Sequence, residues 1–132
     1  MSCSHAGCTN CRELEAQEAQ VQWNETLWAL RASEILTLVT RAYHLEHFDL
    51  TGPLRTAHIA SARQIACYLL RRLTGYSYPM IGEILHRDHS TIIHAYNVVA
   101  KQMAMMPDRK RVIDAMAYAI EHPAEQQRQV AV

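Results

Sequence analysis

Apolar residues recur at three- and four-residue spacing along most of the chain, a pattern that predicts helices. The first such stretch runs from Arg12 to about His44 and is rich in Glu, Gln, Ala and Leu, which favour helices. It forms either one long helix or two shorter ones, because Thr26 or Ser33 could cap a break. Six of its residues are expected in the core: Trp28, Leu30, Ile35, Leu38, Val39 and Tyr43.

Further helices follow at shorter intervals. A short turn-like helix or loop begins at Phe48 and ends at Thr51-Gly52-Pro53, a strong breaker. An amphipathic helix is expected over about 61–73 and a last helix over about 108–121. The first of these should turn Ile65, Ala66, Leu69 and Leu70 inward and Arg63, Gln64, Arg71 and Arg72 outward. The last carries Val112, Ile113, Met116, Ala117 and Ile120 on one stripe.

Between these two helices, residues 77–97 read SYPMIGEILHRDHSTIIHAYN and have the pattern of a helix-turn-helix. Ser77 caps a short apolar helix, a tight His86-Arg87-Asp88 turn follows, and a second helix begins near His89. Its buried side is expected to consist of Ile92, Ile93, Tyr96, Val99 and Ala100. Polar groups gather at its N-terminal end, which is the end that a recognition helix places against base edges in the major groove. The pattern therefore predicts sequence-specific DNA binding.

The same segment carries a family resemblance. Ser-x-Pro-x-Ile-Gly, then Arg-Asp-His-Ser-Thr-Ile-x-His-Ala, and upstream the run Arg63-Gln64-Ile65-Ala66-x-Tyr68-Leu69 are similar to the C-terminal DNA-binding domain of the bacterial replication initiator DnaA. The similarity extends from about Ile35 through Met106. It implies an all-α, compact helical domain with a helix-turn-helix, here with an extra N-terminal helix, that binds DnaA-box-like sites in double-stranded DNA.

Residue chemistry and the resemblance indicate the same contacts with DNA bases. His89 can donate to guanine or thymine, Ser90 can donate or accept, and Asp88 can accept from cytosine N4. Asp88 suits a helix N-cap equally well, and both roles are compatible. The resemblance implies major-groove base contacts at Asp88, His89, Ser90 and His94, and a minor-groove contact at Arg55 in the loop before the Arg63 helix.

Phosphate contacts are expected beside these base contacts. By the resemblance, Arg63, Gln64 and Arg71 match phosphate-contacting positions, and Arg87 and Thr91 flank the base-contacting set. The alternative for each is a place on a solvated helix face.

Two departures from the family affect the expected DNA binding. The loop Gly52–His58 has fewer cations than usual, which predicts weaker, less salt-dependent binding. The turn has no glycine for a left-handed residue, which predicts a slightly re-aimed recognition helix.

Charge is balanced over the whole chain but not along it. The 132 residues have a formal net charge of zero. From Thr51 to Arg111, however, nine basic residues stand against three acidic ones, whereas Arg12–Leu50 has seven acidic residues against three arginines. A basic surface attracts the phosphate backbone, so the middle segment favours nucleic acid as a partner.

Several classes of function are disfavoured. The P-loop pattern G-x-x-x-x-G-K-[ST] is absent, so no nucleotide partner and no ATPase module like that of the initiator are expected. No motif spacing associated with catalysis is present, so the chain is not expected to be an enzyme. It has no apolar run of about 20 residues and no signal-peptide pattern, which predicts a cytoplasmic, nucleoid-associated protein without a membrane partner.

The N-terminal cysteines give a weak candidate for a metal site. Cys3, His5, Cys8 and Cys11 have the residue types of a zinc site, but all four fall within nine residues and no second pair follows. A tail with incidental thiols is the better interpretation, so no cofactor is expected. Cys67 is expected in the core.

The sequence thus predicts a Cys-containing tail and acidic helix over 1–24, the DNA-binding domain over 25–122 and a tail over 123–132. The expected function is sequence-specific binding of double-stranded DNA by a regulator of transcription or replication. The alternative is a protein-interaction adaptor that binds a partner through the acidic N-terminal helix. Glu13, Glu15, Glu18, Glu25 and Trp23 motivate that alternative, and the same helix could mediate self-association.

Overall fold

The computed structural model describes the backbone of residues 9–122 and the side chains of residues 25–122. Within this range the chain forms six helices and no strand, which confirms the all-α prediction. The helices are α1 (Thr9–Tyr43), α2 (His47–Thr51), α3 (Ala57–Leu73), α4 (Tyr78–Leu85), α5 (His89–Met105) and α6 (Pro107–Glu121).

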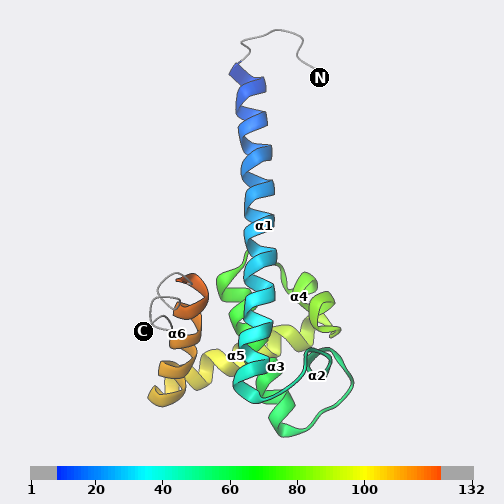
Figure 1. The fold of residues 1–132 in the computed structure, drawn as a ribbon, viewed down its shortest axis with the longest axis vertical. Helices are drawn as coiled ribbons and strands as arrows, with labels where there is room; N and C mark the ends of the chain where they lie inside the picture. The colour runs from blue at the N-terminus through cyan, green and yellow to red at the C-terminus, as the bar shows by residue number, and fades with distance from the viewer. Residues whose placement is uncertain (1–8, 123–132) are drawn as a thin grey trace, which may run out of the picture.

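The first helix is uninterrupted, so the long-helix alternative is the correct one. It ends at Tyr43, and the next residue, His44, has a left-handed φ of 55°. The Leu45 N–H then donates to the Thr40 carbonyl at 2.8 Å, which closes the last turn. The N-terminal part of α1 extends beyond the other helices, while its C-terminal part packs against α3 (Figure 1).

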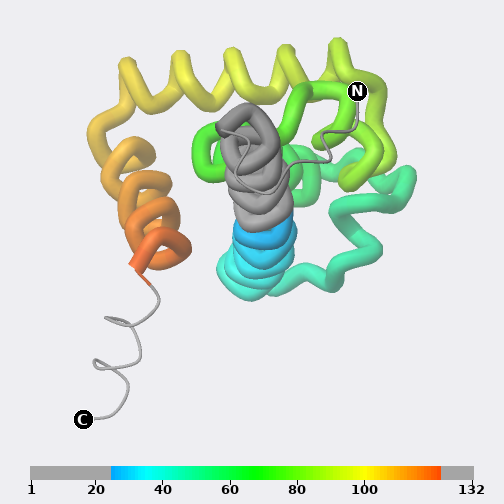
Figure 2. The backbone as a smooth tube through the Cα atoms, turned by 90° about the horizontal axis from the view of Figure 1, so that it is seen from above, coloured from blue at the N-terminus to red at the C-terminus, as the bar shows by residue number. Residues whose placement is uncertain are grey.

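Helix α3 lies at the centre of the domain and contacts each of the other five helices. Its inward face is almost fully apolar, and burial of that face is the main force that holds the helices together. The face consists of Ile59, Ala62, Ile65, Ala66, Cys67, Leu69, Leu70 and Leu73. Helix α5 crosses beside α3 with its N-terminal end on the same side as α4 and the α2–α3 loop (Figure 2). This arrangement brings the α2–α3 loop and the start of α5, which carry most of the predicted DNA contacts, to the same side of the molecule.

Some boundaries and core residues differ from the sequence-based expectation. Helix α3 begins four residues earlier than expected, because the Thr56 hydroxyl caps it by accepting a hydrogen bond from the Ile59 N–H at 3.3 Å. The prediction that Leu30 lies in the core is wrong, since this residue is 59% exposed. The prediction that Val112 belongs to the apolar stripe of the last helix is also wrong, since it is 56% exposed. Cys67 is buried, as expected. None of the helices within the described residues is long and apolar enough to cross a membrane.

Candidate nucleic-acid interface

The helix-turn-helix begins with a capped helix and a tightly closed turn. The Ser77 hydroxyl caps α4 by accepting from the Met80 N–H. At the other end, His86 is left-handed, with φ 55° and ψ 47°, and the Gly82 carbonyl accepts from the N–H groups of His86 and Arg87. The turn therefore reaches the left-handed conformation without a glycine, at a histidine.

A glycine is required elsewhere, inside α4. A Cβ atom built on Gly82 would lie under 3.0 Å from the Arg87 carbonyl oxygen, a distance that real Cβ atoms essentially never show. Because that oxygen belongs to the backbone, it cannot rotate away. Gly82 thus permits the close approach of the turn to α4.

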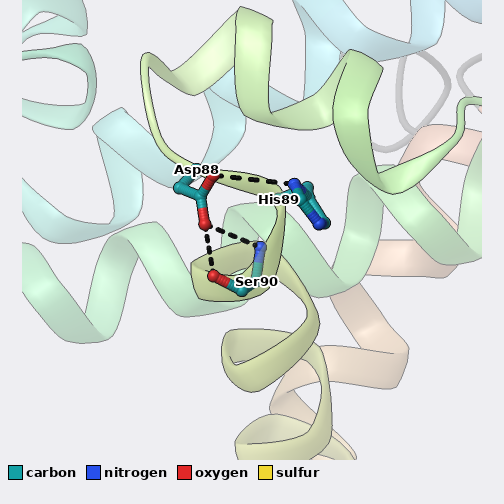
Figure 3. Close-up of polar contacts among 3 residues, drawn as sticks. All are labelled: Asp88, His89 and Ser90. Carbon is teal, nitrogen blue, oxygen red and sulfur yellow. Dashed lines mark hydrogen bonds and ion pairs between the residues drawn. The ribbon is translucent and has the colours of Figure 1, made fainter.

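The start of α5 is fixed by Asp88. One carboxylate oxygen accepts from the Ser90 N–H at 3.3 Å and from the Ser90 hydroxyl, and the other lies 3.6 Å from His89 Nδ1 (Figure 3). The N-cap interpretation is therefore confirmed, while the base contact stays a prediction. The hydrogen bonds from Ser90 lower the pKa of Asp88 below its ordinary value, so the cap carries a negative charge at neutral pH.

The first turns of α5 separate a buried face from a solvent-facing one. Ile92, Ala95, Val99 and Met103 are buried, whereas Ile93, Tyr96 and Ala100 are only half-buried. His89, Ser90, Thr91 and His94 are all exposed. The end of the helix that was expected to face the bases is thus accessible.

A cavity of about 280 Å³ lies between the α2–α3 loop, α3 and α5. Six of the predicted DNA-contacting residues line it: Arg55, Arg63, Gln64, Arg87, Thr91 and His94. Cys67, Ile92 and Ala95 add apolar surface, and none of the lining residues is acidic. Three arginines therefore line one cavity without a carboxylate in its wall, which makes its surroundings electropositive.

The expectation that Arg63 faces outward is wrong. Only 8% of the residue is exposed, and its guanidinium donates to the backbone carbonyl of Leu50 at 2.8 Å and to those of Asp49 and Leu54 at 3.1 Å. Burial, and next the positive charge of Arg87, lower the pKa of Arg63 from its ordinary value. The amphipathic pattern placed every arginine of α3 outside, because it cannot reveal carbonyl oxygens that a neighbouring loop supplies.

Arg71 is a predicted phosphate contact that does not line this cavity. It is half-buried, and its guanidinium lies 4.5 Å from the centroid of the Tyr78 ring while donating to the Tyr76 carbonyl at 2.9 Å. The stacking on Tyr78 is a contact that sequence reasoning missed, although an arginine on α3 and a tyrosine beginning α4 were both visible. Arg72, next to it, pairs with Asp114 of α6 at 2.9 Å.

The remaining candidate residues have side chains that lie outside the part of the chain that the structure describes. Cys3, His5 and Cys8 lie outside the described residues, as does the side chain of Cys11. Among the described side chains, no group of three or more His, Cys, Asp or Glu is placed to hold a metal ion. The side chains of Glu13, Glu15, Glu18 and Trp23, which motivated the adaptor alternative, are likewise outside the described part.

Comparison with known proteins agrees with this geometry. The family described as the bacterial dnaA protein helix-turn-helix matches residues 32–99. The chain is 39% identical to the chromosomal replication initiator protein DnaA of Lactococcus lactis subsp. cremoris over 93 residues, which are 70% of this chain and 20% of that protein. It is 44% identical to DnaA of Tropheryma whipplei over 81 residues (61% of this chain, 16% of that protein). It is 36% identical to DnaA of Mycobacteroides abscessus over 110 residues (80% and 22%).

The chain therefore spans about a fifth of the length of these relatives. The family match covers more than half of the chain and includes α3, α4 and most of α5. The protein belongs to the family of bacterial DnaA helix-turn-helix domains, which bind DNA.

Proposed function

We propose that this protein binds double-stranded DNA at DnaA-box-like sites and regulates replication or transcription there. Asp88, His89, Ser90 and His94 contact bases in the major groove, and Arg55 enters the adjacent minor groove. The nucleotide-hydrolysis motif is absent from this chain, so the proposal includes no ATPase step.

The observation that carries the proposal is the shared cavity. Arg55 comes from the α2–α3 loop, while Thr91 and His94 come from the first turns of α5, yet all three line one electropositive hollow. The sugar-phosphate backbone that separates the minor groove from the major groove would present its phosphates to such a hollow. Base edges of the minor groove would then lie on the Arg55 side, and those of the major groove on the α5 side.

The test is a fluorescence-anisotropy titration of the full chain with a DnaA-box-like duplex and a scrambled duplex at two salt concentrations. We expect the box-like duplex to bind about tenfold or more tightly, and His89→Ala to lose about 1–3 kcal/mol of that preference. Lys101→Ala, exposed further along α5 and outside the cavity, is the control and should keep the preference. Equal affinity for both duplexes would contradict sequence-specific recognition.

A further inference from the structure

The loop that carries Arg55 is held in place by a buried arginine. Arg63 Nε donates to the Leu50 carbonyl at 2.8 Å, and Nη2 directs its N–H groups at the carbonyls of Asp49, Gly52 and Leu54 at 3.1, 3.4 and 3.1 Å. The backbone from the end of α2 to the residue before Arg55 is thus arranged around one guanidinium group. A buried guanidinium needs such acceptors, since an unsatisfied buried charge is strongly unfavourable.

A second arginine joins the same loop to the helix-turn-helix. Arg87 lies between the left-handed His86 and the N-cap Asp88, and its Nη2 donates to the Gly52 carbonyl. Its Nη1 donates to the His86 carbonyl at 2.9 Å, which fixes the side chain against its own turn. The Gly52 oxygen therefore accepts from one arginine of α3 and from one arginine of the turn before α5.

Two guanidinium groups around one carbonyl repel each other, so the arrangement is held by hydrogen bonds and not by ion pairing. The ion pairs found among the described residues join Arg72 to Asp114 and Asp88 to His89, and neither includes Arg63 or Arg87. Lysine could not replace either arginine here, because a single ammonium group does not present the planar fork that reaches several carbonyls at once.

We propose that Arg63 and Arg87 are positioning residues that lock the minor-groove loop to the recognition helix through the Gly52 carbonyl. This rests on the proposed function, because it concerns how the two DNA-reading elements are held relative to each other. Its consequence is a fixed distance between the base pairs that Arg55 reads and those that α5 reads. One extra base pair between them separates the two segments by about 3.4 Å and rotates them by about 35°.

The test measures the tolerance to that insertion. The base pairs that the loop reads are identified first, by substituting each base pair of the box-like duplex in turn. They are the ones whose substitution weakens DNA binding by the wild-type protein but does not weaken DNA binding by Arg55→Ala. One base pair is then inserted between them and the segment read by α5. We expect the insertion to weaken wild-type binding about tenfold, a typical effect of one mismatched position. In Arg63→Lys and in Arg87→Lys the insertion should weaken binding less than threefold.

Arg31→Lys is the matched control. Arg31 also donates from its guanidinium to a distant backbone carbonyl, that of Leu73 at 3.0 Å, but it joins α1 to α3 away from the loop. This variant should retain the tenfold insertion penalty. The Arg63 and Arg87 variants could instead retain the tenfold insertion penalty, with their affinity lowered equally for the duplexes with and without the inserted base pair. In that case the two arginines are phosphate contacts and the positioning role is overturned.

A measurement without DNA separates failure of this inference from failure of the proposed function. Nitrogen-15 relaxation of the Leu54, Arg55 and Thr56 amides in the free protein should show greater mobility in each lysine variant than in wild type and in Arg31→Lys. Unchanged relaxation overturns the lock whatever the DNA result. Wild-type binding without preference for the box-like duplex overturns the proposed function instead. Because Arg63 is buried, Arg87→Lys supplies the decisive data if Arg63→Lys does not fold.

Discussion

His86 holds the turn of the helix-turn-helix in a left-handed conformation, and a residue with a Cβ adopts that conformation at a cost of about 1–2 kcal/mol. We therefore expect His86→Gly to raise the free energy of unfolding by about 1 kcal/mol in urea denaturation, because glycine takes this backbone without strain. His86→Val should lower the free energy of unfolding, since a β-branched side chain is least tolerated there. A glycine variant less stable than wild type would contradict the account of the turn.

Gly82 imposes the opposite requirement, for space and not for conformation. In Gly82→Ala the new methyl group would press on the Arg87 carbonyl, which is backbone and must shift. We expect a loss of about 1–3 kcal/mol in the free energy of unfolding, as for other overpacked sites. Glu83→Ala, the exposed neighbour on the same helix, should change it by less than about 0.5 kcal/mol. Equal effects of the two substitutions would show that the turn is not closely packed on α4.

Cys67 should make the free energy of unfolding decrease at alkaline pH. Burial raises the pKa of its thiol to about 12 from an ordinary value of 9.0. The native state therefore keeps its proton where the unfolded chain has lost it, and stability that is present below pH 9 falls as the pH rises toward 12. In a background with Cys3, Cys8 and Cys11 replaced by serine, the free energy of unfolding should fall more steeply from pH 8.5 to 10.5 with Cys67 than with Cys67→Ala. Parallel curves in urea denaturation would contradict this.

Single residues also show the limit of sequence reasoning. Helical spacing correctly placed His89, Ser90 and His94 on the exposed side of α5 and Cys67 in the core. It failed at Arg63, because the acceptors of this side chain are backbone carbonyls of a loop and backbone atoms leave no mark in the sequence. Val112 failed for another reason: it lies next to the true stripe of Ile113, Ala117 and Ile120, and one residue turns a helix by about 100°.

At the scale of elements, the cap of α5 makes the recognition helix sensitive to acid. The pKa of Asp88 is lowered by its hydrogen bonds with Ser90, so its contribution to stability is present above the ordinary value of 3.8 and is lost as the pH falls below it. Asp88→Asn should melt at a lower temperature than wild type at pH 7, and the difference should shrink as the pH falls below 3.8. Circular dichroism melts measure this. Ser90→Ala should melt below wild type at pH 7, because it removes one of the two hydrogen bonds. A pH-independent difference between wild type and Asp88→Asn would contradict the assignment.

The elements themselves could be predicted well, apart from some of their ends. The helix-turn-helix could be recognised from Ser77, Gly82 and the Arg87-Asp88-His89 run, since capping and turn chemistry are local. The start of α3 could have been found from Thr56, which is a favoured N-cap residue. The sequence could not decide between one and two helices before Tyr43, because Thr26 and Ser33 are compatible both with a cap and with a helix interior.

At the scale of the whole molecule, DNA binding should stabilise the fold. The cavity gathers Arg55, Arg63 and Arg87 without a carboxylate, so a phosphate anion relieves their repulsion in the native state alone. At a free duplex concentration of 100 times Kd, we expect a stabilisation of about 2.7 kcal/mol. Differential scanning fluorimetry should therefore show a larger rise in Tm with a box-like duplex than with a scrambled one at equal concentration. Equal shifts, or a shift of the same size in Arg55→Ala, would contradict the role of the cavity.

The length of α1 has a geometric consequence for whatever is joined to its free end. A helix of 35 residues is about 52 Å long, and each residue in it advances the chain by about 1.5 Å and turns it by about 100°. Inserting one residue into the part that extends beyond the other helices would therefore point an attached label to a different side of the molecule, while its distance from the recognition helix hardly changed. The number of residues in this helix therefore determines the direction in which an attached group points more than it determines the distance of that group from the domain.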